Sequence, residues 1–534
     1  MSIKPAWRRA IFISVAILIV VFGALIYKNY YLEEQIRQYI TETINDRAEG
    51  KFELEIGEVS VHLLPRNIYF SDVRFTSNAD AGTNLETNVA SIAVERVRPF
   101  AWIFSDELSV RRIKIDRPAI DVHHLSGDEN HQGLHSLTDR EGENGNGGVR
   151  QITIGETMIN GLSLRYFEAE EMARFSIENS NFILNDISFS PEDGELGPES
   201  VEKFRFDIED IYFTTENGLY ILSAEVVDFE SDSGSLVVHQ FQLLPAYEEK
   251  EFFDYVGHRT DRIELTTHEI TLTGLNMDHA ILSNQLIAES LAIDEADVVI
   301  FRDKNYPQQE SRGRKPLPQE MINSLPIPVY IHDIAATASS IRYEELHEDA
   351  SERGAVYFTD LDVAMADFTN IDSLMTQYGG LSIETDTKFM NESDLQVQFL
   401  IPYQEKLHNI KGDLASTDPQ ILNSVFEPLA GVRIESGFVE SVRFEMQLND
   451  THAIGNAEVI YNDLHIALVD RETFEKNLIR RVGSFFINTF AVESANQPED
   501  PRPGTVDYER EPEKSVFNYW WKSLQSGLMD SIGG

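Results

Sequence analysis

The sequence predicts a mainly β protein that begins with a single N-terminal transmembrane helix. Three observations lead to this fold class: an uncharged apolar run near the start, a two-residue alternation of apolar and polar residues from Phe52 onward, and 90 Asp and Glu against 44 Lys and Arg among 534 residues. Alternation places one face of a strand on an apolar interior and the other in water. The formal charge of −46 argues against nucleic acid as a partner, because phosphates would be repelled.

The apolar run, residues 10–27, begins at Ala10, centres on Leu18 and ends at Tyr27. Eighteen residues at about 1.5 Å each cover roughly 27 Å, which is enough to cross a bilayer core. Basic residues lie within positions 1–9, so the positive-inside rule places this N-terminus in the cytoplasm and the bulk of the chain on the far side. A cleaved signal peptide is the alternative. The length of the run and the lack of a small-x-small cleavage site after it favour an uncleaved signal anchor.

A juxtamembrane helix is expected over residues 28–50. Its apolar residues recur at every fourth position and form one stripe: Leu32, Ile36, Ile40 and Ile44. We expect this stripe to pack against the first strands.

Residues 51–470 form the predicted β-rich body. Short alternating segments such as Ile152-Thr153-Ile154 are separated by Asn, Asp and Gly, a pattern typical of antiparallel hairpins. Long loops are expected near 126–148 and 302–318. The sequence leaves open whether the body is one sheet or several domains.

A short pattern recurs in the body: a polar residue, Asp, an aliphatic residue, any residue and an apolar one. Its aspartates are Asp72, Asp186, Asp210, Asp360 and Asp463. Because Asp side chains cap turns, we interpret these as five entries from a turn into a strand.

The search for catalytic chemistry finds no motif. There is no nucleophile elbow, P-loop, zinc-protease motif or EF-hand, and no cysteine. Four histidines gather in one predicted loop region, where a flexible backbone gives no fixed metal geometry: His123, His124, His131 and His135. We therefore expect no enzyme, no cofactor and no metal site.

The C-terminal end contains a predicted amphipathic helix over 471–496, an acidic Pro-bearing linker over 497–514 and an aromatic amphipathic tail over 515–534. The tail carries possible partner or interface contacts at helical spacing: Phe517, Trp520, Trp521, Leu524 and Leu528. Such a helix docks on its own body, binds the groove of an envelope protein partner or lies at a membrane interface. We expect its removal to affect function more than folding.

Two stretches resemble the AsmA-like family, relatives of TamB and the bridge-like lipid-transfer proteins. The first covers 1–122, with Ile68-Tyr69-Phe70-Ser71-Asp72-Val73 and the strand from Ile113 through Arg117-Pro118 to Val122. The second covers 431–466, from Gly431-Val432-Arg433 to Asp463-Leu464. The Trp520-Trp521 tail departs from the family pattern.

The resemblance implies an elongated, twisted antiparallel sheet curved into an apolar groove, with short amphipathic helices at both ends. It also implies a single-pass protein of the bacterial inner membrane with its bulk in the periplasm, which handles or transfers phospholipid and supports outer-membrane biogenesis and cell-envelope integrity.

Two further functions stay open beside lipid handling: a non-catalytic envelope scaffold or assembly factor that binds other proteins, and an enzyme on a β scaffold. A lipid conduit needs a continuous apolar lane, since each CH₂ left in water costs about 0.8 kcal/mol. A scaffold would bury the same face with its own side chains.

Overall fold

The computed structural model describes residues 27, 31–48, 52–62, 66–77, 83–97, 107–124, 151–168, 173–189, 201–309, 313–475 and 493–533. Within these ranges the chain is mainly β, with 22 strands. This confirms the predicted β class. The chain divides into two compact units, an N-terminal one (1–213 with 225–232) and a C-terminal one (214–224 with 233–534).

The predicted fold is wrong in its membrane-spanning helix. Among the residues that the structure describes, no helix combines the length and the apolar character needed to cross a membrane. The first of them, α2 (Glu33–Arg47), carries charged residues along its whole length. Of the predicted anchor, Ala10 and Leu18 lie outside the described residues, whereas Tyr27 is 58% exposed and stacks on Tyr31.

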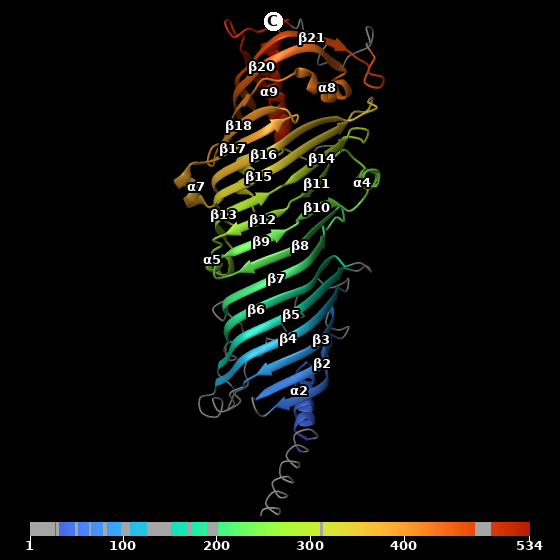
Figure 1. Ribbon diagram of the computed structural model, residues 1–534, viewed down its shortest axis with the longest axis vertical. Coiled ribbons are helices and arrows are strands. Elements are labelled where there is room, and N and C mark those ends of the chain that lie inside the picture. The colour runs from blue at the N-terminus through green and yellow to red at the C-terminus, as the bar shows by residue number, and fades with distance from the viewer. Residues whose placement is uncertain are drawn as a thin grey trace, which may run out of the picture. The chain divides into compact units, whose positions relative to one another are not determined.

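In the N-terminal unit α2 is followed by strands that pair in chain order (Figure 1). The strands are β1 (Phe52–His62), β2 (Asn67–Ser77), β3 (Thr83–Glu95), β4 (Glu107–His124), β5 (Gln151–Glu168), β6 (Phe175–Phe189) and β7 (Val201–Thr214). A wholly antiparallel sheet, as predicted, is wrong here too, because β4 and β5 run parallel. The loop predicted at 126–148 lies outside the described residues.

The C-terminal unit contains the larger set of elements. Strand β8 (Tyr220–Glu230) is divided between the two units. The further strands of the C-terminal unit are β9 (Ser235–His239), β10 (Gln242–Pro245), β11 (Asp261–Thr266), β12 (Glu269–Thr273), β13 (Leu286–Asp294), β14 (Asp297–Asp303), β15 (Val329–Leu346), β16 (Gly354–Thr369), β17 (Gly380–Phe389), β18 (Ser393–Pro402), β19 (Leu407–Leu414), β20 (Val432–Asn449), β21 (His452–Leu468) and β22 (Gly504–Glu509). Its helices are α4 (Glu249–Val256), α5 (Met277–Leu282), α6 (Pro318–Asn323), α7 (Asp372–Tyr378), the 3-10 turn η5 (Pro419–Leu422), α8 (Asn423–Ala430) and α9 (Val516–Ile532).

The long strand β15 joins two shorter ladders. Its first half pairs in parallel with β13 and its second half in parallel with β14. Between the halves Ala338 has a positive φ of 50°. From β15 to β22 every further pair is antiparallel and follows chain order.

The five recurring aspartates lie inside strands, so their interpretation as turn-to-strand entries is wrong. Their φ values are all positive, between 47° and 52°, and cross-strand pairing skips each one: Asp72, Asp186, Asp210, Asp360 and Asp463. Asp tolerates the left-handed conformation better than most residues. Such interruptions bend a strand and increase its twist.

The C-terminal segments differ from the prediction in one respect. The predicted linker, 497–514, contains strand β22, which pairs with β21. Of the amphipathic helix predicted over 471–496, residues 476–492 lie outside the described ranges. The predicted aromatic tail is helical as α9, which begins with Ser515 capping Asn518 N. The predicted loop at 302–318 runs from the end of β14 to the start of α6.

Candidate functional site

A row of apolar side chains crosses all seven strands of the N-terminal unit on one face. The register aligns them as direct cross-strand neighbours: Val59, Phe70, Ile92, Ile115, Ile159, Phe182 and Phe206. A second row lies beside the first and is apolar except for Thr157: Val61, Ile68, Val94, Ile113, Thr157, Leu184 and Phe204. We call the face that carries both rows the apolar face.

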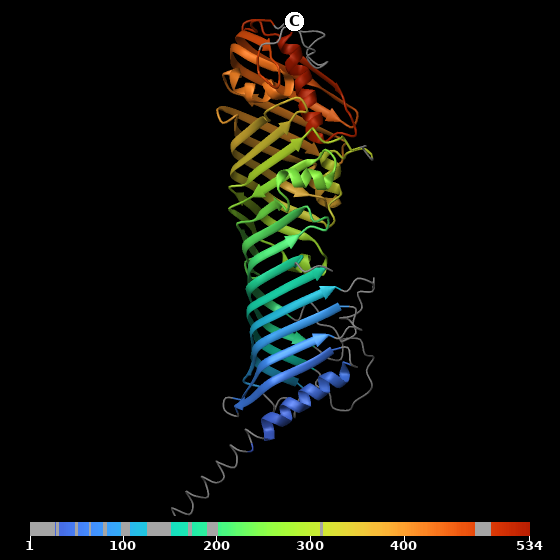
Figure 2. The same ribbon diagram turned by 90° about the vertical axis from the view of Figure 1, so that its right-hand side faces the viewer.

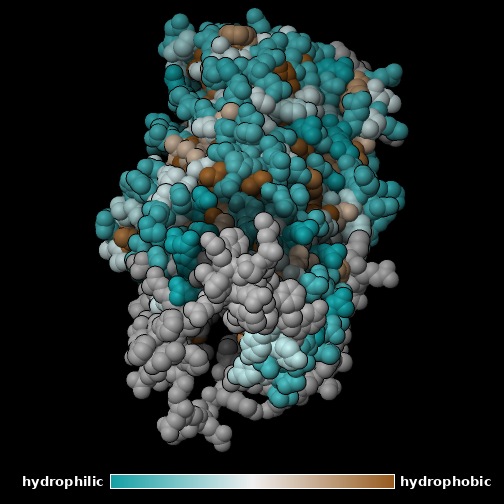
Figure 3. Space-filling view, turned by 60° about the horizontal axis from the view of Figure 1, so that its bottom comes forward, coloured by the Kyte–Doolittle hydropathy of each residue, from teal (hydrophilic) through white to brown (hydrophobic). Residues whose placement is uncertain are grey.

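The opposite face of the same strands is polar. It carries ion pairs, such as Arg165 with its cross-strand neighbour Asp121 at 2.8 Å and Lys114 with Asp116, two residues along the same strand, at 3.0 Å. The Asn160 amide, which donates to Asp116, holds the pKa of that carboxyl below its usual value. The strands therefore have one face suited to water and one suited to hydrocarbon. In Figure 3 most of the coloured surface that faces the viewer is hydrophilic, with hydrophobic residues scattered in it.

At the β1 side of this unit the apolar face is covered by α2 (Figure 2). Three members of the predicted stripe, Leu32, Ile36 and Ile40, pack against the cluster that includes Leu54 and Val59, which confirms the expected packing for them. The fourth member, Ile44, is 40% exposed. Further along, the side chains from Ile92 to Phe206 in the first row are half-buried. Since α2 is the one helix among the described residues of this unit, the structure shows no helix over that part of the face.

An aromatic cluster stands at the β7 side of the apolar face. Phe182 and Phe206 have ring centroids 5.8 Å apart, and Phe229 lies 5.2 Å from Phe204 and 5.3 Å from Phe206. Phe229 is 4% exposed, whereas Phe204 and Phe206 are half-buried. The rings extend the apolar rows with large, polarisable surfaces.

In the C-terminal unit the corresponding interior is filled by the chain itself. Helix α9 packs its Tyr519, Trp520, Leu524 and Leu528 against buried side chains of β19 to β22, including Met446, Leu448 and Val506. The helix approaches β22 closely at Gly527, where an added Cβ would lie 2.6 Å from Val506 Cγ2.

One buried polar contact fixes this docking. The indole Nε1 of Trp520 donates to Nε2 of His408 at 2.7 Å, and Trp520 also packs on Phe399 with centroids 5.2 Å apart. His408 is fully buried. Burial, with the nearby charge of Arg510, lowers the pKa of His408 to about 4, so its Nε2 is a neutral acceptor.

The structure divides the predicted contact residues of the tail into two groups. Trp520, Leu524 and Leu528 belong to the packed interface with the body, which is the self-docking alternative. Phe517 and Trp521 are 70% and 47% exposed. Their role as partner or interface contacts stays a prediction.

The described residues hold no group of three or more His, Asp or Glu that could bind a metal ion. His131 and His135 lie outside those residues, and His123 stacks on Phe167 with centroids 4.3 Å apart.

The resemblance implied an apolar groove, but sequence reasoning did not identify the residues that form the apolar face, although their signal was present. Alternation marked single strands, but only the register shows that their apolar residues align across seven of them. His408 gave no local signal, because its buried partner lies more than one hundred residues away, at Trp520. Neither protein-family models nor curated proteins include a match to this chain.

Proposed function

We propose that this protein handles phospholipid, holding acyl chains on the apolar face of its N-terminal unit, and acts without catalysis in support of the outer membrane and the cell envelope. The predicted resemblance to AsmA-like proteins supports the same function. The location in the inner membrane, with the bulk in the periplasm, stays a prediction.

The observation that carries the proposal is the unbroken row from Val59 to Phe206. The part of the row that α2 does not cover, from Ile92 to Phe206, spans four steps between neighbouring strands at about 4.8 Å each, or roughly 19 Å, which is more than half of the roughly 30 Å hydrocarbon thickness of a bilayer. Half-buried apolar side chains along this length leave contact area for an acyl chain. Each CH₂ that leaves water for the row contributes about 0.8 kcal/mol.

The second candidate function, an envelope scaffold or assembly factor, is favoured by a different observation. In the C-terminal unit α9 fills the interior, while its Phe517 and Trp521 stay exposed. Exposed aromatic residues on a docked helix suit contact with another protein. The two functions are compatible, because they belong to different units.

A pair of neighbouring substitutions tests the lipid function. Ile159 lies in the first apolar row, whereas Met158 faces the opposite side, between Lys114 and Ile183. The full-length chain carrying Ile159→Asp or Met158→Asp would be purified, extracted with solvent and analysed for phospholipid per protein by mass spectrometry. We expect Ile159→Asp to lower the bound lipid about tenfold, because a carboxylate next to an acyl chain costs more than 1.4 kcal/mol.

Met158→Asp serves as the matched control and should leave the lipid content near that of the unaltered chain. Thermal melting of both variants identifies any loss that is due to unfolding. Equal lipid content in two folded variants would show that the apolar face is not where lipid binds.

A further inference from the structure

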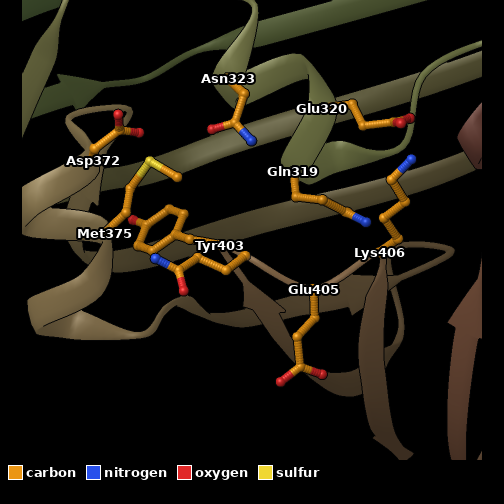
Figure 4. A pocket seen from close by; sticks show the side chains of 9 residues that line it. Gln319, Glu320, Asn323, Asp372, Met375, Tyr403, Glu405 and Lys406 are labelled. Carbon is orange, nitrogen blue, oxygen red and sulfur yellow. The ribbon is translucent and has the colours of Figure 1, made fainter.

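A pocket of about 320 Å³ lies in the C-terminal unit, between α6, the start of α7 and the turn that joins β18 to β19. Figure 4 shows its side chains. Met375 and the ring of Tyr403 give it an apolar floor, and Gln319, Asp372 and Lys406 are among its polar lining. Met375 and Tyr403 belong to a packed hydrophobic cluster with Leu381 and Ile401, and this packing holds the apolar floor of the pocket in place.

Gln319 is the unusual member of this lining. Its side chain is 3% exposed, yet neither its amide oxygen nor its amide nitrogen has a hydrogen-bond partner among the described residues. A buried amide without partners destabilises the folded protein, because it has lost its hydrogen bonds to water, and native structures hold few such groups. In Figure 4 the amide extends from α6 toward Lys406. A ligand that both donates and accepts there would satisfy both atoms.

Among the described residues, one cation and two carboxylates that line the pocket have no ion-pair partner: Lys406, Asp372 and Glu405. Arg314 contacts Glu320 and Asp450, and Arg510 contacts Asp450, so two guanidinium groups balance two carboxylates.

The positions of these three groups differ. Lys406 and Asp372 lie at opposite ends of the pocket, and Glu405 directs its carboxylate away from both (Figure 4). The pocket therefore has Lys406 near one end and Asp372 at the other, with the buried amide near Lys406, while the Glu320 carboxylate, whose pKa the Arg314 and Lys406 charges help to lower, lies on the side of Lys406.

We propose that this pocket binds a small zwitterion, with its anionic group at Lys406, its ammonium group at Asp372 and a polar linker on the amide of Gln319. A phosphoethanolamine group has this chemistry, either as a soluble molecule or as a lipid head group. The site goes beyond the lipid function proposed above, because it lies in the other unit and needs no acyl chain.

Three soluble probes test the site by calorimetric titration of the full-length chain: glycerophosphoethanolamine, glycerophosphate, which lacks the ammonium group, and ethanolamine, which lacks the anion. We expect the zwitterion to bind at least about tenfold more tightly than either fragment, since each fragment lacks one charged hydrogen bond. Equal binding of all three, or no binding of the zwitterion, would overturn the proposal.

Substitutions separate binding from folding. Gln319→Met keeps the size of the side chain and removes the unpartnered amide, so the melting temperature should stay or rise while zwitterion affinity falls about tenfold. Asp372→Asn should weaken glycerophosphoethanolamine but not glycerophosphate. Glu384→Gln, an exposed change on β17, is the control and should alter neither. A folded Gln319→Met variant with full affinity would contradict the site.

Flotation with vesicles of phosphatidylethanolamine in phosphatidylcholine, compared with phosphatidylcholine alone, distinguishes the source. Binding that depends on phosphatidylethanolamine and is lost in Asp372→Asn identifies a lipid head group as the ligand. Binding of the soluble probe without such flotation identifies a free zwitterion. Phospholipid loss in Ile159→Asp is a separate readout, so failure of this site and failure of the lipid function are distinguishable.

Discussion

Each of the five recurring aspartates is skipped by the cross-strand pairing. This interruption lets two apolar residues three positions apart lie on the same face of the strand. A plain two-residue period would send Phe70 and Val73 to opposite faces, yet both pack in the cluster under α2. Between them Asp72 takes a φ of 52° and shifts the phase of the strand. The apolar–polar–Asp–apolar pattern is therefore a local signal for an interruption within a strand. The sequence displayed it, but propensity alone suggested a turn.

Replacement of Asp186 tests this account of the pattern. Asp186→Gly should leave stability unchanged or slightly raised, because Gly adopts positive φ without strain. Asp186→Val should destabilise the protein by about 1–3 kcal/mol, since a β-branched side chain is strained there. The measurement is urea unfolding of the full-length chain, with Thr153→Val on β5 as the control for added Val. Equal midpoints for the Gly and Val variants would show that φ at this position is unimportant.

The buried His408 predicts a pH dependence of stability. Its folded pKa of about 4 lies below the unfolded value of about 6.5. Between these values the unfolded chain binds the extra proton, so the contribution is complete above about pH 6.5 and is lost as the pH falls to about 4. The loss amounts to roughly 3 kcal/mol.

The measurement is the free energy of unfolding between pH 4 and 7, compared with His408→Leu, which removes the titrating group. The difference between the two proteins should shrink as the pH falls. Parallel curves would mean that His408 is protonated in the folded protein, which the hydrogen bond from Trp520 does not allow.

At the scale of elements, α2 and α9 perform the same task in their separate units. Asn45 of α2 bonds both backbone groups of Leu54, and Glu33 accepts from Val61 N, along the free edge of β1. Asp530 and Ser526 of α9 accept from the backbone of β22 at Thr505 and Asp507. Each helix thus satisfies an edge that would otherwise pair with another chain.

The two adjacent tryptophans of α9 differ in burial: Trp520 packs against the body, whereas Trp521 is exposed. Trp520→Ala removes a side chain packed on Phe399 and bonded to His408, so we expect a loss of about 2–4 kcal/mol of stability. Trp521→Ala changes an exposed residue and should cost under about 1 kcal/mol. Thermal and urea unfolding of the two full-length variants measure this. The result also tests our earlier expectation that the tail affects function more than folding, because a large shift from Trp520→Ala makes α9 part of the core.

Both helices were predictable as amphipathic segments, and so was the packing of α2 on the first strands, but the strands on which α9 packs were not. Periodicity marked Leu32, Ile36 and Ile40 for α2, and those residues do pack. In α9 the most buried positions include Ser523 and Gly527, small residues that hydrophobic periodicity ignores. Close approach to a strand selects small side chains, and the strand concerned, β22, lay in a segment predicted as a linker because of its prolines.

At the scale of the molecule, features set by residues close together in the sequence were predictable, and features set by residues far apart in the sequence were not. Alternation is local, so the β class and the polar outer face were predictable. Pairing order is not local: the parallel pair of β4 and β5 and the division at β15 depend on partners far along the chain. Gln319 likewise carries no local sign of burial.

The central claim is that acyl chains lie on the apolar face of the N-terminal unit, and photocrosslinking tests it most directly. Phe182 lies in the first row, and its neighbour Ile183 faces the opposite side, between Met158 and Arg205. A benzoyl-phenylalanine at either position of the full-length chain would be irradiated in cells, and the protein analysed by mass spectrometry for phospholipid adducts. The account predicts adducts at position 182 and none at 183. Adducts at 183 alone, or at neither position in a folded protein, would contradict it.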